Sequence, residues 1–110
     1  SAAFVNGEVV GGVPVLDVQY GNVWTNIDKA TFGKLGANVG DSLRVSIYRK
    51  GELVYEENVL YGDTFADVPE GKPVAYFNSL LNFSMAINMG NFAERYHVGS
   101  GAEWQMKIRK

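Results

Sequence analysis

Polar side chains stand beside aromatic ones at several points where the apolar runs of this sequence are broken. The set comprises Asp17, Tyr20, Asn22, Trp24, Phe65, Asn78, Ser79 and Asn88. Flat rings can sandwich a heteroaromatic ring, and an amide side chain offers a donor and an acceptor together, as the edge of an adenine requires. The carboxylate of Asp17 could hold an ammonium group. These residue types therefore suggest a binding site for an adenosine-like ligand.

The same residues also have a purely structural interpretation. Tyr20 and Trp24 could be core aromatics, and the asparagines could be turn formers that tolerate left-handed dihedral angles. Composition alone favours this second interpretation, so the two remain open at this point.

Residues with catalytic potential are few. His97 is the sole histidine, follows a short predicted helix and has no evident partner. Glu56 and Glu57 are neighbours in a predicted strand, so their side chains point to opposite faces and cannot act as a pair. With no cysteine and one histidine, thiolate and His-rich metal sites are excluded. We therefore expect no catalytic residue and no metal site in this chain.

The net charge and the hydropathy of the chain argue against nucleic acid and membranes as partners. Ten basic and twelve acidic side chains give a formal charge of −2, so nucleic acid is an unfavourable partner. No apolar run approaches the ~20 residues that span a bilayer, and the start lacks the regions of a signal peptide. These features predict a cytoplasmic chain without membrane contact. The opening "SAAF" has no initiator Met, which suggests a piece of a longer polypeptide.

Alternation of apolar and polar residues dominates the chain and predicts one mostly β domain over residues 1–110. Strands are predicted at residues 4–10, 13–18 and 23–27, two more in the hairpin 43–59, one at 73–77 that returns at 83–87, and a last one at 102–108. Gly11-Gly12 is predicted to form a bend or bulge, and Lys50-Gly51 a tight turn.

Two short helices are predicted, at 29–32 with Asp28 as cap and at 91–96 with Asn91 as cap. A long loop is predicted at residues 60–72, and loops of that length are uncommon unless they are functional. The number of strands favours a closed barrel or a sandwich of antiparallel strands, because closure removes exposed edges.

Three segments resemble a known family when they are taken in order. They are "LDVQYGNVWTNI", "GDTFADV" and "VAYFNSLLNFSMAINMGNFAERYHVGSG". Together they are similar to the C-terminal domain of the S-adenosylmethionine hydroxide adenosyltransferases, whose relatives include the fluorinase and the chlorinase. "YGNVWTNI" looks very like the fluorinase form of its motif.

The resemblance implies an all-β fold, a closed Greek-key antiparallel β-barrel of about seven strands with two short helices. In the family this domain follows a larger N-terminal α/β domain, which is absent from this chain. Family members form homotrimers, and each active site lies between the N-terminal domain of one subunit and the C-terminal domain of its neighbour.

The resemblance also implies roles for individual residues, all in binding of S-adenosylmethionine or adenosine. Asp17 would face the methionine ammonium, and Ser79 would meet both the ammonium and the carboxylate. Tyr20 and Phe65 would line the adenine or ribose, Asn22 would bond the adenine edge and Trp24 would pack behind them. The backbone near Met89 would pair with the adenine amino group, and Asn78 is counted with this substrate-binding set.

Two departures from the fluorinase form indicate which reaction is catalysed. Leu80 and Ile87 stand where fluorinase-like members carry arginines. Both favour the branch that transfers hydroxide, which converts S-adenosylmethionine and water to adenosine and methionine without a metal or redox cofactor. We expect the isolated domain to be inactive. A halogenase domain, a stand-alone adenosine-binding module and a purely structural interaction domain are the alternatives.

Overall fold

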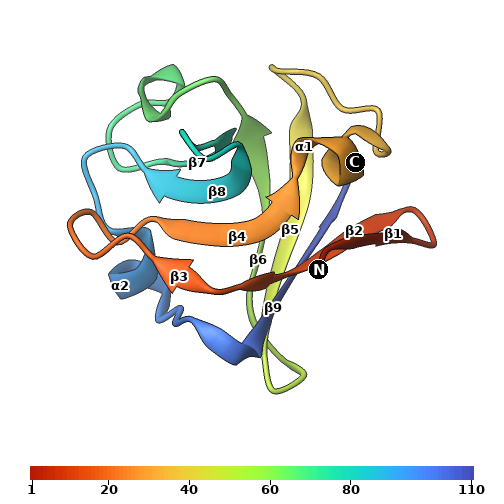
Figure 1. Cartoon of the computed structure of the whole chain (residues 1–110). Coiled ribbons are helices and arrows are strands. Elements are labelled where there is room, and N and C mark those ends of the chain that lie inside the picture. Colours follow the sequence, from red (N-terminus) through yellow and green to blue (C-terminus); the bar gives the residue numbers. More distant parts are fainter.

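Nine strands form one curled sheet in the computed structural model, which describes residues 1–110 (Figure 1). The strands are β1 (Ala3–Val5), β2 (Glu8–Val13), β3 (Val15–Leu16), β4 (Val23–Asp28), β5 (Ser42–Arg49), β6 (Glu52–Tyr61), β7 (Pro73–Phe77), β8 (Asn82–Ile87) and β9 (Gly101–Arg109). Two short helices, α1 (Lys29–Gly33) and α2 (Phe92–Tyr96), and one 3₁₀ turn, η1 (Phe65–Asp67), lie in the connections. The predicted mostly β class with two short helices is confirmed.

The strand order is β1-β2-β9-β5-β6-β7-β8-β4-β3. Every neighbouring pair is antiparallel except β6 and β7, which run parallel with Leu60 opposite Val74 and Tyr61 opposite Ala75. The prediction of a wholly antiparallel sheet is therefore wrong at this pair. The physical reason is the long connection through η1, since parallel neighbours need a crossover that carries the chain back along the sheet.

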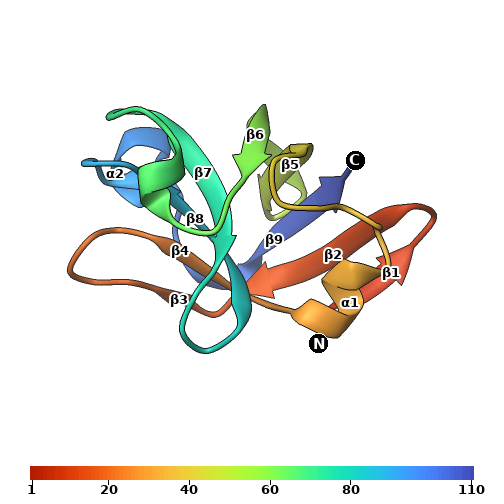
Figure 2. The same ribbon diagram turned by 90° about the horizontal axis from the view of Figure 1, so that it is seen from above.

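The sheet curls until β2 and β4, which are distant in the strand order, lie side by side (Figures 1 and 2). They meet through a side chain: Gly12 N–H donates to Oδ1 of Asn26 at 2.8 Å. A methyl group at Gly11 would overlap Ile27, so glycine permits this close approach. The ladder itself has two ends, at β1 and β3, so a closed barrel remains a prediction.

Two predicted strands have different limits in the structure. The strand predicted at 4–10 is divided by a tight turn at Asn6 and Gly7, whose φ angles of 52° and 82° suit this Asn-Gly pair. The strand predicted at 13–18 is reduced to Val15–Leu16, because the chain enters a loop at Asp17. The division at Asn6-Gly7 is one reason that the structure has nine strands where about seven were predicted.

Other predicted elements are found where expected. The hairpin predicted at 43–59 is formed by β5 and β6, although β6 continues to Tyr61 into the predicted loop. Asp28 caps α1 by accepting from Thr31 N–H at 3.1 Å, and Asn91 caps α2 by accepting from Glu94 N–H at 2.8 Å. The register shift near the glycine pair lies between Gly12 and Val13.

Aromatic rings fix both helices to the sheet. Phe32 of α1 stacks on Phe83 of β8 with ring centroids 5.3 Å apart. Phe92 of α2 is fully buried and its ring meets that of Tyr55 at 5.0 Å. Because burial of a large ring is the main contribution that such short helices can make to stability, these contacts hold α2 at the end of the sheet where the connection from β3 to β4 turns.

Candidate functional site

The corner between β3 and β4, residues 17–22, is closed on itself and packed against the start of α2. Gly21 N–H donates to the carbonyl of Asp17 at 2.7 Å, and Asp17 N–H donates to the carbonyl of Asn22 at 2.9 Å. Gly21 has φ of +70°, and a methyl group there would overlap the side chain of Asn91. Ala93 N–H also donates to the Gly21 carbonyl at 3.0 Å. The corner needs glycine both for its backbone conformation and for its close approach to α2.

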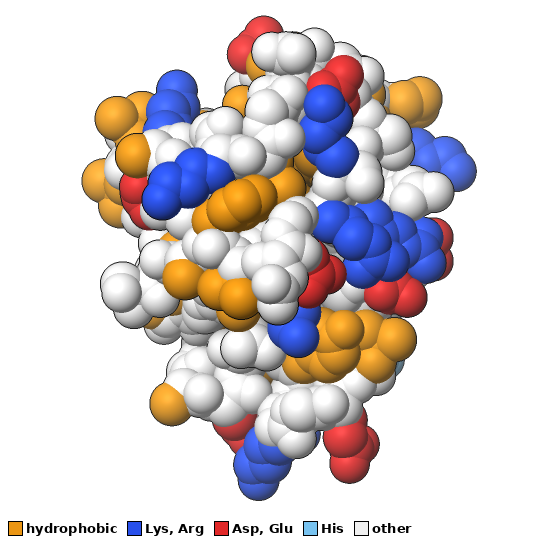
Figure 3. Space-filling model, turned by 90° about the vertical axis from the view of Figure 1, so that its right-hand side faces the viewer, with side chains coloured by type: hydrophobic (Ala, Val, Ile, Leu, Met, Phe, Trp, Pro, Cys, Tyr) orange, Lys and Arg blue, Asp and Glu red, His pale blue; other side chains and the backbone are white.

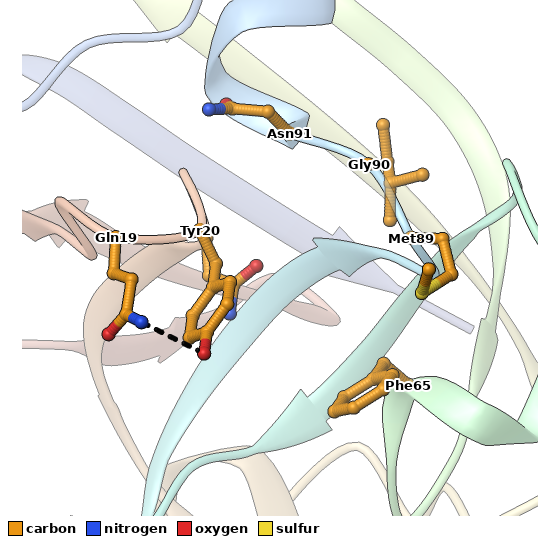
Figure 4. A pocket seen from close by; sticks show the side chains of 8 residues that line it. Gln19, Tyr20, Phe65, Met89, Gly90 and Asn91 are labelled. Carbon is orange, nitrogen blue, oxygen red and sulfur yellow. Dashed lines mark hydrogen bonds between the residues drawn. The ribbon is translucent and has the colours of Figure 1, made fainter.

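A pocket of about 630 Å³ opens beside this corner. It is lined by Gln19, Tyr20, Asn22, Phe65, Ile87, Met89, Gly90 and Asn91. These residues come from three segments: the corner, η1, and the chain from the end of β8 to the cap of α2. Tyr20 and Gln19 stand on one side and Phe65 and Met89 on the other (Figure 4). The volume lies within the range of small-molecule sites.

The walls of this pocket are exposed apolar groups. Tyr20 is 59% exposed, Phe65 48% and Met89 78%. Core aromatics are buried, so the interpretation of Tyr20 as a core residue is wrong. Trp24 is partly buried on β4 and does not line the pocket, which is consistent with packing behind it. Two rings and a thioether that face solvent around one hollow can enclose a flat apolar ligand.

Asn22 forms hydrogen bonds with two polar side chains behind the pocket wall. The Asn22 Nδ2 group donates to Oδ2 of Asp17 at 3.4 Å and to the hydroxyl of Tyr76 at 3.3 Å. Burial, followed by the charge of Asp17, raises the pKa of the Tyr76 hydroxyl above its ordinary value, so it is neutral at physiological pH. The indole N–H of Trp24 lies near that hydroxyl, yet it is buried without a hydrogen bond of good geometry.

The site residues predicted from sequence do not all line the pocket. Tyr20, Asn22, Phe65 and Met89 line the pocket together. Asp17 faces an adjoining hollow and contacts two residues of the pocket, Asn22 and Gln19, whose backbone N–H donates to Asp17 Oδ1 at 3.1 Å.

The turn after β7 lies outside the pocket. Asn78 is buried, and its Oδ1 accepts from Leu80 N–H at 2.8 Å and Asn82 N–H at 3.2 Å, while Nδ2 donates to Ser84 Oγ at 2.9 Å. Ser79 is exposed on the same turn. The amide of Asn78 thus shapes the turn, and the predicted ligand roles of Asn78 and Ser79 remain predictions.

Four lining residues were not predicted as site residues: Gln19, Ile87, Gly90 and Asn91. Gln19 Nε2 donates to the Tyr20 hydroxyl at 3.0 Å (Figure 4). Asn91 was recognisable only as a helix cap. Their positions in the sequence could have indicated them, because Ile87, Gly90 and Asn91 lie close to Met89, and Gln19 precedes Tyr20.

Titratable side chains elsewhere on the chain do not form a second candidate site. No group of three or more His, Cys, Asp or Glu side chains is arranged to hold a metal ion. His97 is exposed in the left-handed position that ends α2, with φ of 57°. Glu56 accepts from Ser46 Oγ at 2.6 Å, and this bond, followed by the charge of Arg44, lowers the pKa of its carboxyl.

Charges of both signs are mixed on the face that carries the β1–β2 hairpin, and apolar side chains form small separate groups there (Figure 3). Arg109 pairs with Glu8 at 3.3 Å, and Arg49 with Glu103 at 3.3 Å. Such exposed pairs leave no strong field of one sign on this face. No helix of the chain is both long enough and apolar enough to cross a membrane.

The sequence matches a family model described as the SAM hydroxide adenosyltransferase C-terminal domain over residues 11–105. A fluorinase of Nocardia brasiliensis is 36% identical over 102 residues, which cover 92% of this chain and 33% of that protein. A fluorinase of Actinopolyspora mzabensis is 31% identical over 96 residues, covering 86% of this chain and 31% of that protein. The chain thus spans about a third of the length of these curated relatives.

Two solved structures resemble the fold. An uncharacterized conserved protein from Thermotoga maritima superposes with a TM-score of 0.85 at 26% identity, covering 100% of this chain and 39% of that one. A conserved hypothetical protein from Thermus thermophilus superposes with a TM-score of 0.58 at 30% identity, covering 97% of this chain and 36% of that one. In both, the matched region is part of a longer polypeptide.

Proposed function

Because the chain belongs to the SAM hydroxide adenosyltransferase C-terminal domain family, we propose that its pocket binds the adenosine part of S-adenosylmethionine. The whole protein would then transfer the adenosyl group to water and release adenosine and methionine. The observation that carries the proposal is the gathering of Tyr20, Asn22, Phe65 and Met89, three of them exposed apolar groups, around one pocket.

Each wall of the pocket offers what an adenosine would need. Tyr20 and Phe65 supply ring faces from opposite sides (Figure 4). Asn22 supplies a polar amide in the wall, and the backbone around Met89 and Gly90 supplies further donors and acceptors at the rim. Asp17 lies outside this pocket, so its proposed contact with the ammonium requires the methionine part to extend into the adjoining hollow.

The proposed reaction needs alignment more than acid–base chemistry. The oxygen of water forms a bond to the ribose carbon that carries the sulfonium, the carbon–sulfur bond breaks, and its electron pair stays on sulfur to give methionine. The proton of the attacking water leaves to solvent. A positive sulfur is a good leaving group, so the site contributes mainly by aligning the attacking water and by excluding other water from the reacting groups. The proposal requires no metal or redox cofactor, since S-adenosylmethionine is the substrate.

The pocket is open on one side, which fits a shared site. We propose that the family's N-terminal α/β domain, from a neighbouring subunit of a homotrimer, covers it and supplies the groups around the nucleophile. The exposure of Tyr20, Phe65 and Met89 supports this arrangement, because apolar groups of this size are normally covered in the working assembly.

Binding of adenosine to the 110-residue chain tests the proposal directly. We expect adenosine to shift the backbone amide signals of the pocket residues in an NMR titration, and Asn22→Ala to weaken binding about tenfold, because one hydrogen bond to the base is lost. Asn38→Ala is the matched control, since Asn38 is exposed in a loop away from the pocket. Equal binding by both variants would contradict the role of Asn22.

Transfer to halide is the second candidate, because the curated relatives are named fluorinases. The apolar Ile87 in the pocket and the exposed Leu80 support water instead, since both positions lack the arginine of the fluorinase form. Incubation of the full-length protein with S-adenosylmethionine in fluoride, chloride or halide-free buffer separates the two. Adenosine as the product in all three buffers supports the hydrolase, and a halogenated adenosine refutes it.

A further inference from the structure

The orientation of the Asn22 amide is fixed by two residues behind the pocket wall. Its Nδ2 group faces Oδ2 of Asp17 at 3.4 Å and the Tyr76 hydroxyl at 3.3 Å. An ionised carboxylate can only accept hydrogen bonds, so the side of the amide that faces Asp17 must be the NH₂ side. Both Nδ2 hydrogens then have partners, and Oδ1 is the atom left for the pocket.

Tyr76 is itself held in place by packing. It lies on β7, where its backbone is paired with Ser84 of β8, and Ser84 is in turn paired with Trp24 of β4. Its ring packs against a small buried cluster of Val68, Val74 and Ala86. A half-buried ring held by its strand and by this cluster presents its hydroxyl at one position, which makes it a stable acceptor for the Asn22 amide.

The Asn22 Oδ1 atom has no hydrogen-bond partner within the chain and is not sealed from solvent. Asn22 therefore presents an acceptor to the pocket, and a ligand gains a hydrogen bond there by offering an N–H donor. The amino group of adenine is such a donor, whereas the carbonyl of hypoxanthine at the same position is an acceptor and would meet Oδ1 unfavourably.

We propose that Tyr76, which does not line the pocket, is a positioning residue that holds the Asn22 amide with Oδ1 toward the ligand and so makes the site select aminopurines over oxopurines. The choice of ligand rests on the proposed function, but the positioning of the amide does not. Removal of the Tyr76 hydroxyl releases one of the two Nδ2 bonds and leaves only the 3.4 Å contact with Asp17 to hold the amide, so its orientation becomes less fixed.

Tyr76→Phe tests this role because it keeps the ring and removes only the hydroxyl. In ¹⁵N spectra of the ligand-free chain we expect the side-chain amide signals of Asn22 to move in this variant. In titrations with adenosine and inosine we expect the preference for adenosine to fall about threefold to tenfold, which corresponds to the loss of one positioning hydrogen bond. Tyr48→Phe is the matched control, since Tyr48 lies on β5 beside Lys107, and neither the signals nor the preference should change.

Each result has a definite meaning. Asn22 amide signals that stay in place in Tyr76→Phe overturn the positioning role, whatever the ligand. Signals that move while the adenosine preference is retained overturn the selectivity. If the signals move but the wild-type chain ignores adenosine, the positioning role stands and the proposed function fails.

Discussion

Two buried polar atoms lack a hydrogen-bond partner, and they lie in different settings. The Trp24 indole N–H is behind the pocket wall, next to Tyr76. The Tyr55 hydroxyl is on β6, where the Tyr55 ring is 5% exposed and lies 5.0 Å from the Phe92 ring and 4.6 Å from the Tyr96 ring. A buried hydroxyl without a partner loses its hydration and gains nothing in return. The ring of Tyr55 therefore stabilises the fold, while its hydroxyl weakens it.

Tyr55→Phe should raise the free energy of unfolding by about 1 kcal/mol at pH 8, because it removes only the unpaired hydroxyl. Burial, followed by the charges of Tyr96 and Glu57, raises the pKa of the Tyr55 hydroxyl above its ordinary value of 10.0. The folded chain thus holds this proton more tightly than the unfolded chain, and stability falls as the pH rises above about 10. The variant should lose less stability than the wild type between pH 8 and pH 11.

Urea unfolding at the two pH values measures both effects. Tyr48→Phe is again the control, because the Tyr48 ring is only partly buried. A Tyr55→Phe variant that is less stable than the wild type at pH 8 would show that the hydroxyl has a partner.

At the scale of elements, the pocket is built from short segments rather than from the long strands. The corner at 17–22 is fixed by Gly21, α2 by its Asn91 cap and the buried Phe92, and η1 by Asp67. Asp67 Oδ2 accepts from Asp63 N–H at 2.8 Å, which closes the loop that carries Phe65. Such short elements have little stability of their own, so their side-chain caps and close contacts determine where the pocket residues lie.

Gly21→Ala tests the junction of the corner with α2. We expect it to lower the free energy of unfolding by about 2 kcal/mol or more, because the new methyl group needs a strained backbone and displaces Asn91. Gly36→Ala is a matched control, because Gly36 has a φ of +71° and open space around it. This substitution should lower the free energy of unfolding by only about 1 kcal/mol, since alanine is strained in this backbone conformation but meets no neighbour. Urea unfolding gives both values, and equal losses would show that the Asn91 contact is unimportant.

At the scale of the whole molecule, the order and direction of the strands bring the three pocket segments to one end. The corner precedes β4, the segment with Met89 follows β8, and the crossover with η1 enters β7, and these three strands are consecutive neighbours. The parallel pairing of β6 and β7 is what places Phe65 at this end. The result is one open wall of a site, with no ionised side chain among the residues that line it.

We therefore expect the 110-residue chain alone to leave S-adenosylmethionine intact beyond its spontaneous breakdown, because nothing in this wall aligns or desolvates a nucleophile. Chromatographic assay for adenosine and methionine, with a protein-free reaction as the control, measures this. Adenosine formation that disappears in Asn22→Ala would contradict the expectation and show that the chain is a complete enzyme.

Several features of the site could be predicted from local sequence. The corner at Gly21, the ring residues Tyr20 and Phe65, and the caps Asp28 and Asn91 were predicted because turn and cap residues act on their immediate neighbours. The turn at Asn6-Gly7 carries an equally local signal in its Asn-Gly pair. The role of Asn78 could not be predicted from its residue type, because an asparagine amide can bind a ligand or shape a turn. Its hydrogen bonds belong to the turn.

The sequence by itself determined the mostly β class, most strand positions and the short helices, because alternation, caps and turns depend on residues a few positions apart. Only the tertiary structure decided the parallel pairing of β6 with β7, the meeting of β2 with β4, and which polar residues share one wall. It also decided that Tyr76 contacts Asn22, although 54 positions separate them in the chain. Such contacts depend on how strands that are distant in sequence pair and curl. The alternation of residues within one strand does not indicate which other strand will lie beside it.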